Sequence, residues 1–218
     1  EEWLAAHKAH LVEEKALTRA RDALAEKRRA LPWVRVDTTY TFDTPHGRKT
    51  LAELFNGRSQ LIVYHFMLGP DWEEGCPGCS FVSDHIDGAL QHVEQRDIAY
   101  VAVSRAPLEK IEAFKQRMGW HFRWVSSFGS DFNYDYHVSF TSEQREKGKV
   151  YYNFEMNDVT AGGFGSDELP GLSVFYKDDA GEVFHTFSAY GRGGEPLIGT
   201  YSLLDLTPVS YTHLRAHE

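Results

Sequence analysis

The chain has 218 residues, of which 42% are hydrophobic and 25% are charged, and these proportions exclude an intrinsically disordered chain. Its formal net charge of -9 argues against nucleic acid and anionic membranes as partners, because both attract an excess of Lys and Arg. No apolar run approaches the roughly 20 residues that a membrane-spanning helix needs. The composition therefore predicts a globular domain that can bury a core.

The first thirty residues predict one long helix. Residues 2–31 are rich in Ala, Leu, Glu, Lys and Arg and contain neither Gly nor Pro, and Pro32 ends the pattern. Two interpretations of this arm, residues 1–32, stay open. It packs against its own domain, or it pairs with a second copy in a homodimer. The leucines that would form the seam recur at seven-residue steps in two runs, Leu4 and Leu11, then Leu17, Leu24 and Leu31.

Strand and helix patterns then alternate along the body of the chain. Continuous apolar runs rich in β-branched residues predict strands that are buried on both faces. Strand–helix–strand–helix–strand with short links predicts an α/β fold with parallel strands at its centre. In chain order, the predicted elements are a strand at 34–42, a helical turn at 51–55, a strand at 61–67, a helix after Cys76, a strand at 98–103, a helix at 107–119 and a strand at 121–126.

Residues 127–168 do not fit this alternation. The segment is rich in aromatic residues and contains Gly162 and Gly163. A segment this long is usually functional or contains further elements. We therefore keep two interpretations, a lid over a substrate site and an ordinary insertion packed on the core.

The last part of the chain predicts a hairpin and a short helix. Residues 172–176 and 182–187 flank an Asp-Asp-Ala-Gly turn, a pattern typical of an antiparallel pair. A final helix is predicted at 197–206. Residues 209–218 differ in character from what precedes them and are interpreted as a non-native tail. The folded domain is therefore expected to span residues 33–208.

The strongest signal is the pair of cysteines in Cys76-Pro77-Gly78-Cys79, the only two in the chain. The pair stands between a predicted buried strand and a helix. With Cys76 at the N-cap and Pro77 at N1, free backbone N–H groups and the helix dipole favour the nucleophilic thiolate of Cys76. Cys79, one turn further on, is placed to attack a mixed disulfide formed on Cys76. This spacing predicts dithiol redox chemistry.

Several motifs resemble one bacterial family. LFNGRSQLIVYHFM, GPDWEEGCPGCSF, AVSRAP, RMGW, WVSS and FNYDY, spread over about residues 2–208, are similar to domain-of-unknown-function family 899. Its members are labelled predicted dithiol-disulfide oxidoreductases. The resemblance implies an α/β thioredoxin-like fold, with a central mixed sheet and flanking helices. It also implies that Cys76 attacks, that Cys79 resolves, that Pro170 is a cis-proline beside the dithiol, and that no bound cofactor or metal is needed.

The sequence departs from thioredoxins at several positions. The central dipeptide is Pro-Gly rather than Gly-Pro, and the aromatic residue, Trp72, stands four positions before Cys76. The buried acid of thioredoxins has no counterpart, and Tyr64 or His65 falls near its place. His65 is either a core histidine or a proton donor to the dithiol.

Substrate-binding residues are expected at three positions. They are Trp72, Pro170 and Arg105, of which Arg105 follows a predicted parallel strand, where ligand sites are common. For Arg105 the alternative is an ordinary salt bridge.

Three functions stay open. The favoured one is thiol–disulfide exchange on a protein or small-molecule substrate, with an unknown electron donor. The second is a thiol peroxidase, although Gly69 and Glu73 replace the Pro and Thr of the peroxiredoxin pattern. The third is a non-enzymatic redox sensor or metal site, in which His65 or His137 would join the cysteines. A cytoplasmic location is expected because no export signal is visible, and there a C-x-x-C pair is more plausibly catalytic than structural.

Overall fold

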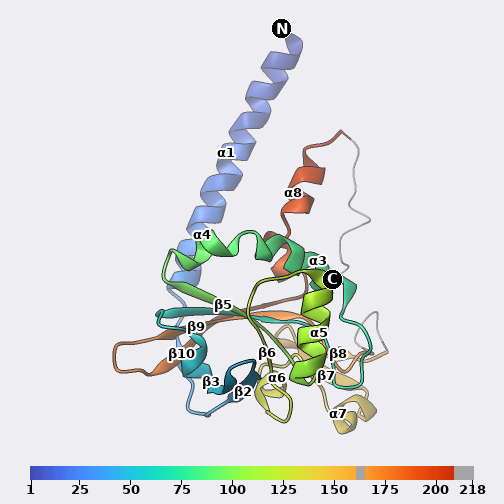
Figure 1. The fold of residues 1–218 in the computed structure, drawn as a ribbon. Coiled ribbons are helices and arrows are strands. Elements are labelled where there is room, and N and C mark those ends of the chain that lie inside the picture. The colour runs from blue at the N-terminus through green and yellow to red at the C-terminus, as the bar shows by residue number, and fades with distance from the viewer. Residues whose placement is uncertain (161–164, 209–218) are drawn as a thin grey trace.

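A computed structural model describes residues 1–160 and 165–208 of the chain. An eight-stranded mixed sheet lies at the centre, in the order β1-β10-β9-β4-β5-β6-β2-β3 (Figure 1). Its strands are β1 (Val34–Arg35), β2 (Thr41–Thr44), β3 (Gly47–Thr50), β4 (Gln60–His65), β5 (Ile98–Ser104), β6 (Trp124–Ser126), β9 (Gly171–Lys177) and β10 (Val183–Tyr190). The predicted tail, and Gly162 and Gly163 of the predicted insertion, lie outside the described residues.

Helices connect and flank these strands. They are α1 (Glu2–Arg29), α2 (Leu51–Leu54), α3 (Pro77–Asp87), α4 (Leu90–Glu94), α5 (Leu108–Met118), α6 (Phe132–Asp135), α7 (Ser142–Glu146), the 3-10 helix η1 (Gly191–Leu197) and α8 (Gly199–Asp205). None of the described helices is both long and apolar enough to cross a membrane.

The centre of the sheet is parallel, as the alternating pattern predicts. β4 pairs in parallel with β5, and β5 pairs in parallel with β6. The hairpin of β9 and β10 is also confirmed, and β9 lies antiparallel to β4. Both central strands are buried on two faces because a separate apolar cluster covers each face. Along β5, Val101 and Val103 belong to one cluster, and Tyr100 and Ala102 belong to the other.

The single strand predicted at residues 34–42 is wrong. The chain instead forms β1, which pairs with β10 at one edge of the sheet, and β2, which pairs with β3 and β6 near the opposite edge. The alternating pattern at residues 34–42 therefore belongs to two strands, which lie near opposite edges of the sheet. Pairing partners that are distant in sequence decide where it divides.

The insertion at residues 127–168 contains secondary structure of its own. α6 and α7 lie in it, together with the two-stranded sheet of β7 (Lys149–Tyr152) and β8 (Glu155–Asp158). A third apolar cluster joins the insertion to the ends of the main sheet. Its buried members are Val138, Phe140, Val150, Tyr152, Leu169 and Tyr190.

The helical arm extends away from the body (Figure 1). α1 has 28 residues and none of them is buried. At its carboxyl end, the Arg28 guanidinium lies 4.7 Å from the ring centre of Phe187 on β10. The interpretation that the arm packs along its own domain is therefore wrong. Pairing with a second copy stays a prediction.

A matched pair of substitutions tests the contribution of the arm to stability. We expect Leu24→Ser, which changes a side chain 57% exposed, to alter the free energy of unfolding by less than about 0.5 kcal/mol. Phe175→Ala, at a residue that is 0% exposed, is expected to cost about 3–5 kcal/mol because it leaves a cavity. Urea unfolding followed by circular dichroism measures both values. A loss at Leu24 that depends on protein concentration would contradict this expectation and indicate a dimer.

Candidate active site

The two cysteines lie at the amino end of α3, which follows β4 and a loop. Cys76 is the N-cap residue and Pro77 occupies the first turn, as the sequence predicts. The backbone N–H of Cys79 donates to the Cys76 sulfur at 3.4 Å. The N–H of Cys76 donates to the carbonyl of Met67 at 3.1 Å, which anchors the N-cap to the loop after β4. This arrangement holds both sulfurs at one helix end.

The two thiols have opposite acidities. Cys76 is partly exposed, and its pKa falls from 9.0 to about 6. The hydrogen bond from the Cys79 thiol is the largest cause, and the backbone N–H groups of Cys79 and Gly78 add to it, while burial opposes it. Cys79 is 1% exposed, and burial holds its pKa well above 9.0. Cys76 is therefore the thiol that ionises near neutral pH, and Cys79 keeps its proton while the pair is reduced.

Tyr64 is the polar group beside the buried thiol. It is 4% exposed, and its hydroxyl is hydrogen-bonded to Cys79. Burial raises the pKa of Tyr64 well above 10.0, so the hydroxyl stays protonated. Together with the Met67 backbone N–H, which donates to the Cys79 sulfur at 3.5 Å, it can stabilise that sulfur when the sulfur loses its proton.

His65 points to the other face of β4, because successive side chains on a strand alternate between faces. Its Nε2 lies 2.9 Å from the hydroxyl of Ser173, and its ring stacks near Phe132 and Tyr136. Burial lowers the pKa of His65 to about 3. His65 is thus a neutral core histidine, and the structure does not place it beside the dithiol.

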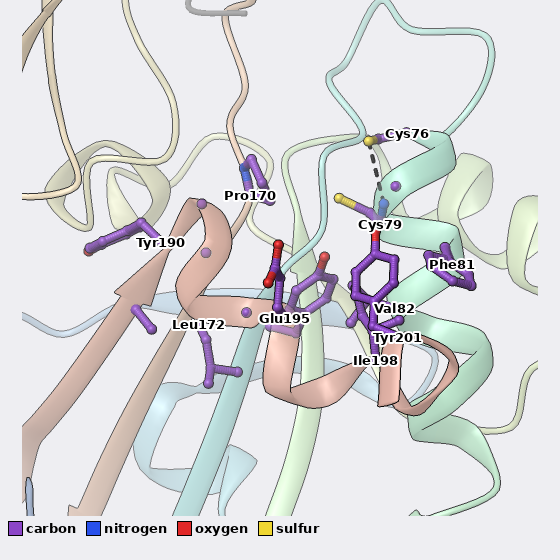
Figure 2. A pocket seen from close by; sticks show the side chains of 16 residues that line it. Cys76, Cys79, Phe81, Val82, Pro170, Leu172, Tyr190, Glu195, Ile198 and Tyr201 are labelled. Carbon is purple, nitrogen blue, oxygen red and sulfur yellow. Dashed lines mark hydrogen bonds between the residues drawn. The ribbon is translucent and has the colours of Figure 1, made fainter. Parts of the chain in front are cut away.

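A cavity of about 150 Å³ opens next to the cysteines (Figure 2). Its walls come from α3, the start of β9, the end of β10, η1 and α8. The lining residues are Tyr64, Cys76, Gly78, Cys79, Phe81, Val82, Pro170, Gly171, Leu172, Ala189, Tyr190, Gly191, Gly194, Glu195, Ile198 and Tyr201.

The C-terminal segment forms one wall of this cavity because it is docked on α3. Nε2 of His85 lies 2.7 Å from the Thr200 hydroxyl, and the Phe81 and Tyr201 rings meet edge to face at 5.7 Å. The sequence predicts a helix here but not its contact with the dithiol. In the sequence, only His85 hinted at this contact, as a polar residue about two turns beyond Cys79 on the same helix.

Pro170 lines the cavity beside the cysteines, but the peptide bond before it is not cis. No cis peptide bond occurs among the described residues, so the expectation taken from thioredoxins is wrong here. Trans is the ordinary state of an X-Pro bond. The insertion holds this stretch from outside, since the Leu169 N–H donates to the Val138 carbonyl and the Tyr152 hydroxyl donates to the Pro170 carbonyl.

Arg105 and Trp72 do not line the cavity. Nε of Arg105 donates to the Glu168 carboxylate at 2.5 Å, and its guanidinium also contacts Asp167 and the Tyr134 hydroxyl. The Trp72 indole N–H donates to Asp167 at 3.3 Å. These residues form a second cluster, which ties the insertion to the loops that follow β4 and β5. Of the three expected substrate-binding residues, only Pro170 is brought to the dithiol.

The described residues contain no group of three or more His, Cys, Asp or Glu side chains arranged to hold a metal ion. His65 faces away from the cysteines. His137, the other histidine considered, packs against the Tyr151 ring in the insertion.

Comparison with known families decides where this chain belongs. Residues 1–213 match the family described as bacterial protein of unknown function, DUF899. The chain belongs to this family. The resemblance inferred from the motifs is thus confirmed, and no curated protein matches the chain.

The fold of this DUF899 protein has a central mixed sheet, flanking helices and the two cysteines at the start of α3. Peroxiredoxin Q of Xanthomonas campestris is 12% identical over 82% of this chain and 97% of its own, with a TM-score of 0.48. A candidate protein disulfide isomerase of Bacteroides thetaiotaomicron is 17% identical over 79% of this chain and 91% of its own, with a TM-score of 0.42.

The acidity of Cys76 is directly testable. We expect its alkylation rate by iodoacetamide to fall as pH falls, with a midpoint near pH 6, because only the thiolate reacts. Cys79→Ala removes the strongest hydrogen bond to Cys76 and should move this midpoint upward toward 9. Cys79→Ser keeps an O–H donor and should move it less. Equal midpoints in all three proteins would show that Cys79 does not set the acidity.

Glu168 predicts a pH dependence of stability. Burial raises its pKa from 4.5 to about 7 against the opposing effects of Arg105 and Ser139, so the folded chain holds a proton that the unfolded chain releases. Its contribution therefore makes the free energy of unfolding fall as pH rises from about 4.5 to 7, by at most about 1.4 kcal/mol per pH unit. We expect Glu168→Gln to flatten this slope in urea unfolding series. Parallel curves for the two proteins would contradict the assignment.

Proposed function

We propose that this DUF899 protein catalyses thiol–disulfide exchange through Cys76 and Cys79. The observation that carries the proposal is the unequal pair of thiols, one acidic and reachable from the cavity, the other buried and protonated. Such a pair divides nucleophilic attack and resolution between two sulfurs one helical turn apart. Helix ends that lower a thiol pKa in this way are typical of reactive cysteines.

The proposed reaction balances within the site. The Cys76 thiolate attacks one sulfur of a substrate R–S–S–R′, the S–S bond breaks, and R′S⁻ leaves. Cys79 then attacks the Cys76 sulfur of the mixed disulfide, and its proton goes to the departing RS group, which leaves as RSH. The substrate disulfide gains two electrons, and the two cysteines lose them by forming their own disulfide.

Tyr64 has a positioning role in the second step. Its hydroxyl donates to the Cys79 sulfur as that sulfur becomes anionic in a buried place, where an unpaired charge is costly. A phenol, unlike the carboxylic acid of thioredoxins, stays neutral across the physiological pH range. It therefore supports the thiolate by hydrogen bonding and does not act as a base.

Thiol peroxidase activity is the second candidate, because an acidic thiol in a cavity can also attack a hydroperoxide. Among the residues that the structure describes, the side chains that line the cavity include no Lys, Arg or His to polarise a peroxide. Arg105 is engaged by Glu168 and Asp167 instead. Exchange is therefore the reaction that the site supports best, and the cytoplasm is its proposed compartment.

A redox titration tests the proposal. The protein is equilibrated in graded glutathione and dithiothreitol buffers, and free thiols are trapped by alkylation and counted by mass spectrometry. We expect one reversible two-thiol transition between about -270 and -120 mV, the range of known exchange proteins. Because a low thiol pKa stabilises the dithiol, the midpoint should lie above the thioredoxin end of this range.

Cys76→Ser is the matched control, and it should show no transition. Thiols that never pair, or that become reactive only after a chelator is added, would overturn the proposal. Consumption of hydrogen peroxide much faster than exchange with any disulfide would favour the peroxidase instead.

A further inference from the structure

The cavity beside Cys76 has the size and polarity of a site for a small apolar group. Apart from Glu195, its lining side chains are apolar or aromatic or are the two cysteines. A dry apolar cavity of about 150 Å³ is the size that holds benzene. The Tyr190 hydroxyl donates to the Tyr136 carbonyl at 3.0 Å, so its polar end is already partnered within the fold.

The charge at this cavity does not suit an anionic substrate. Glu195 is the one charged side chain among the lining residues, and it accepts a hydrogen bond from Nε of Arg192 at 2.9 Å. Figure 2 shows Glu195 on η1, across the cavity from α3. A carboxylate of a ligand such as oxidised glutathione would find an acidic group at this wall and no cation among the described lining residues.

An extended peptide also lacks its usual means of binding next to the dithiol. A peptide that adds to a sheet needs unpaired backbone groups along a strand edge. Here the Leu169 N–H and the Pro170 carbonyl are already hydrogen-bonded by the insertion, through Val138 and Tyr152. Gly171 lies between β4 and β10, paired with His65 on one side and Tyr190 on the other.

We propose that the substrate is a small disulfide or thiol that carries an aromatic or branched aliphatic group, and that this group binds in the cavity while its sulfur meets Cys76. This inference rests on the proposed function, since it names the substrate class for the same dithiol. η1 and α8 form the walls of the cavity that face α3 and would contact the bound group. The insertion covers the edge where a peptide would otherwise bind.

Methanethiosulfonates test this inference with a matched electrophile. In each reagent R–S–SO₂CH₃, the Cys76 thiolate forms Cys76–S–S–R and displaces methanesulfinate, and Cys79 then forms the protein disulfide and releases RSH. The leaving group in the first step is the same whatever R is. Stopped-flow rates are compared for benzyl, 2-sulfonatoethyl and 2-trimethylammonioethyl reagents, with N-acetylcysteine as the reference thiol without a cavity.

For each charged reagent, we compare the ratio of the benzyl rate to the rate of that reagent. We expect this ratio to be at least tenfold larger for the protein than for N-acetylcysteine. Equal ratios for protein and reference would overturn the inference. A preference for the trimethylammonioethyl reagent over the benzyl reagent would also overturn it, because attraction to Glu195 and not the apolar cavity would then govern binding.

Ala189→Leu narrows the cavity from β10, and Ala113→Leu on the exposed face of α5 is its control. We expect the first substitution to lower the benzyl preference at least fivefold and the second to leave it unchanged. If Ala189→Leu fails to fold, the wild-type protein with added benzyl alcohol is measured. Occupation of the cavity should then lower the same preference, and an unchanged preference would contradict the inference.

Release of RSH separates the two proposals. One equivalent of RSH per chain from all three reagents, without a benzyl preference, would overturn the substrate class and leave the exchange function intact. No release from any reagent, with Cys76 remaining modified, would overturn the exchange function itself.

Discussion

The chemistry of this protein depends on the hydrogen bonds that converge on one sulfur at the start of α3. The Cys76 sulfur accepts hydrogen bonds from the backbone N–H of Cys79 and from the thiol of Cys79. Both donors come from the first turn of α3. The start of α3 is held at the end of β4 by the hydrogen bond from the Cys76 N–H to the Met67 carbonyl. A thiolate placed elsewhere on this acidic chain would lack this stabilisation.

The same turn gives the two sulfurs different environments. Both cysteines line the cavity, but Cys76 is partly exposed, whereas Cys79 is buried beside the Tyr64 hydroxyl. The burial that raises the pKa of Cys79 also keeps its proton available for donation to Cys76. The acidity of one thiol is therefore a consequence of the burial of the other, and the pair acts as a unit.

Two segments outside the central parallel strands enclose the site beside the cysteines. The insertion at residues 127–168 hydrogen-bonds the main chain beside Pro170 and is itself held by the Arg105 and Glu168 ion pair. The C-terminal η1 and α8 dock on α3 through His85 and Phe81 and supply the facing wall. Enclosure removes the backbone edge and leaves apolar surface, which is the physical basis for the small apolar substrate that we propose.

The central strands and the start of α3 could be predicted from local sequence. Apolar runs at residues 61–67 and 98–103 are strands because a strand buried on both faces admits few other patterns. The C-x-x-C spacing placed Cys76 at a helix N-cap, since Pro77 suits the first turn and cannot donate an N–H. These features depend on neighbours within a few residues, which is why the place of the cysteines at a helix start could be predicted.

Other features were decided only by the tertiary structure. The pattern at residues 34–42 divides between two edges of the sheet, and Arg105 pairs with Glu168, 63 positions away, instead of meeting a ligand. Tyr64 and His65 point to opposite faces of β4. Tyr64 faces the dithiol because α3 packs on its face of the strand.

The sequence by itself determined the family, the dithiol and the central strands. The tertiary structure decided which residues surround the dithiol, because partners distant in the chain meet only through packing and strand pairing.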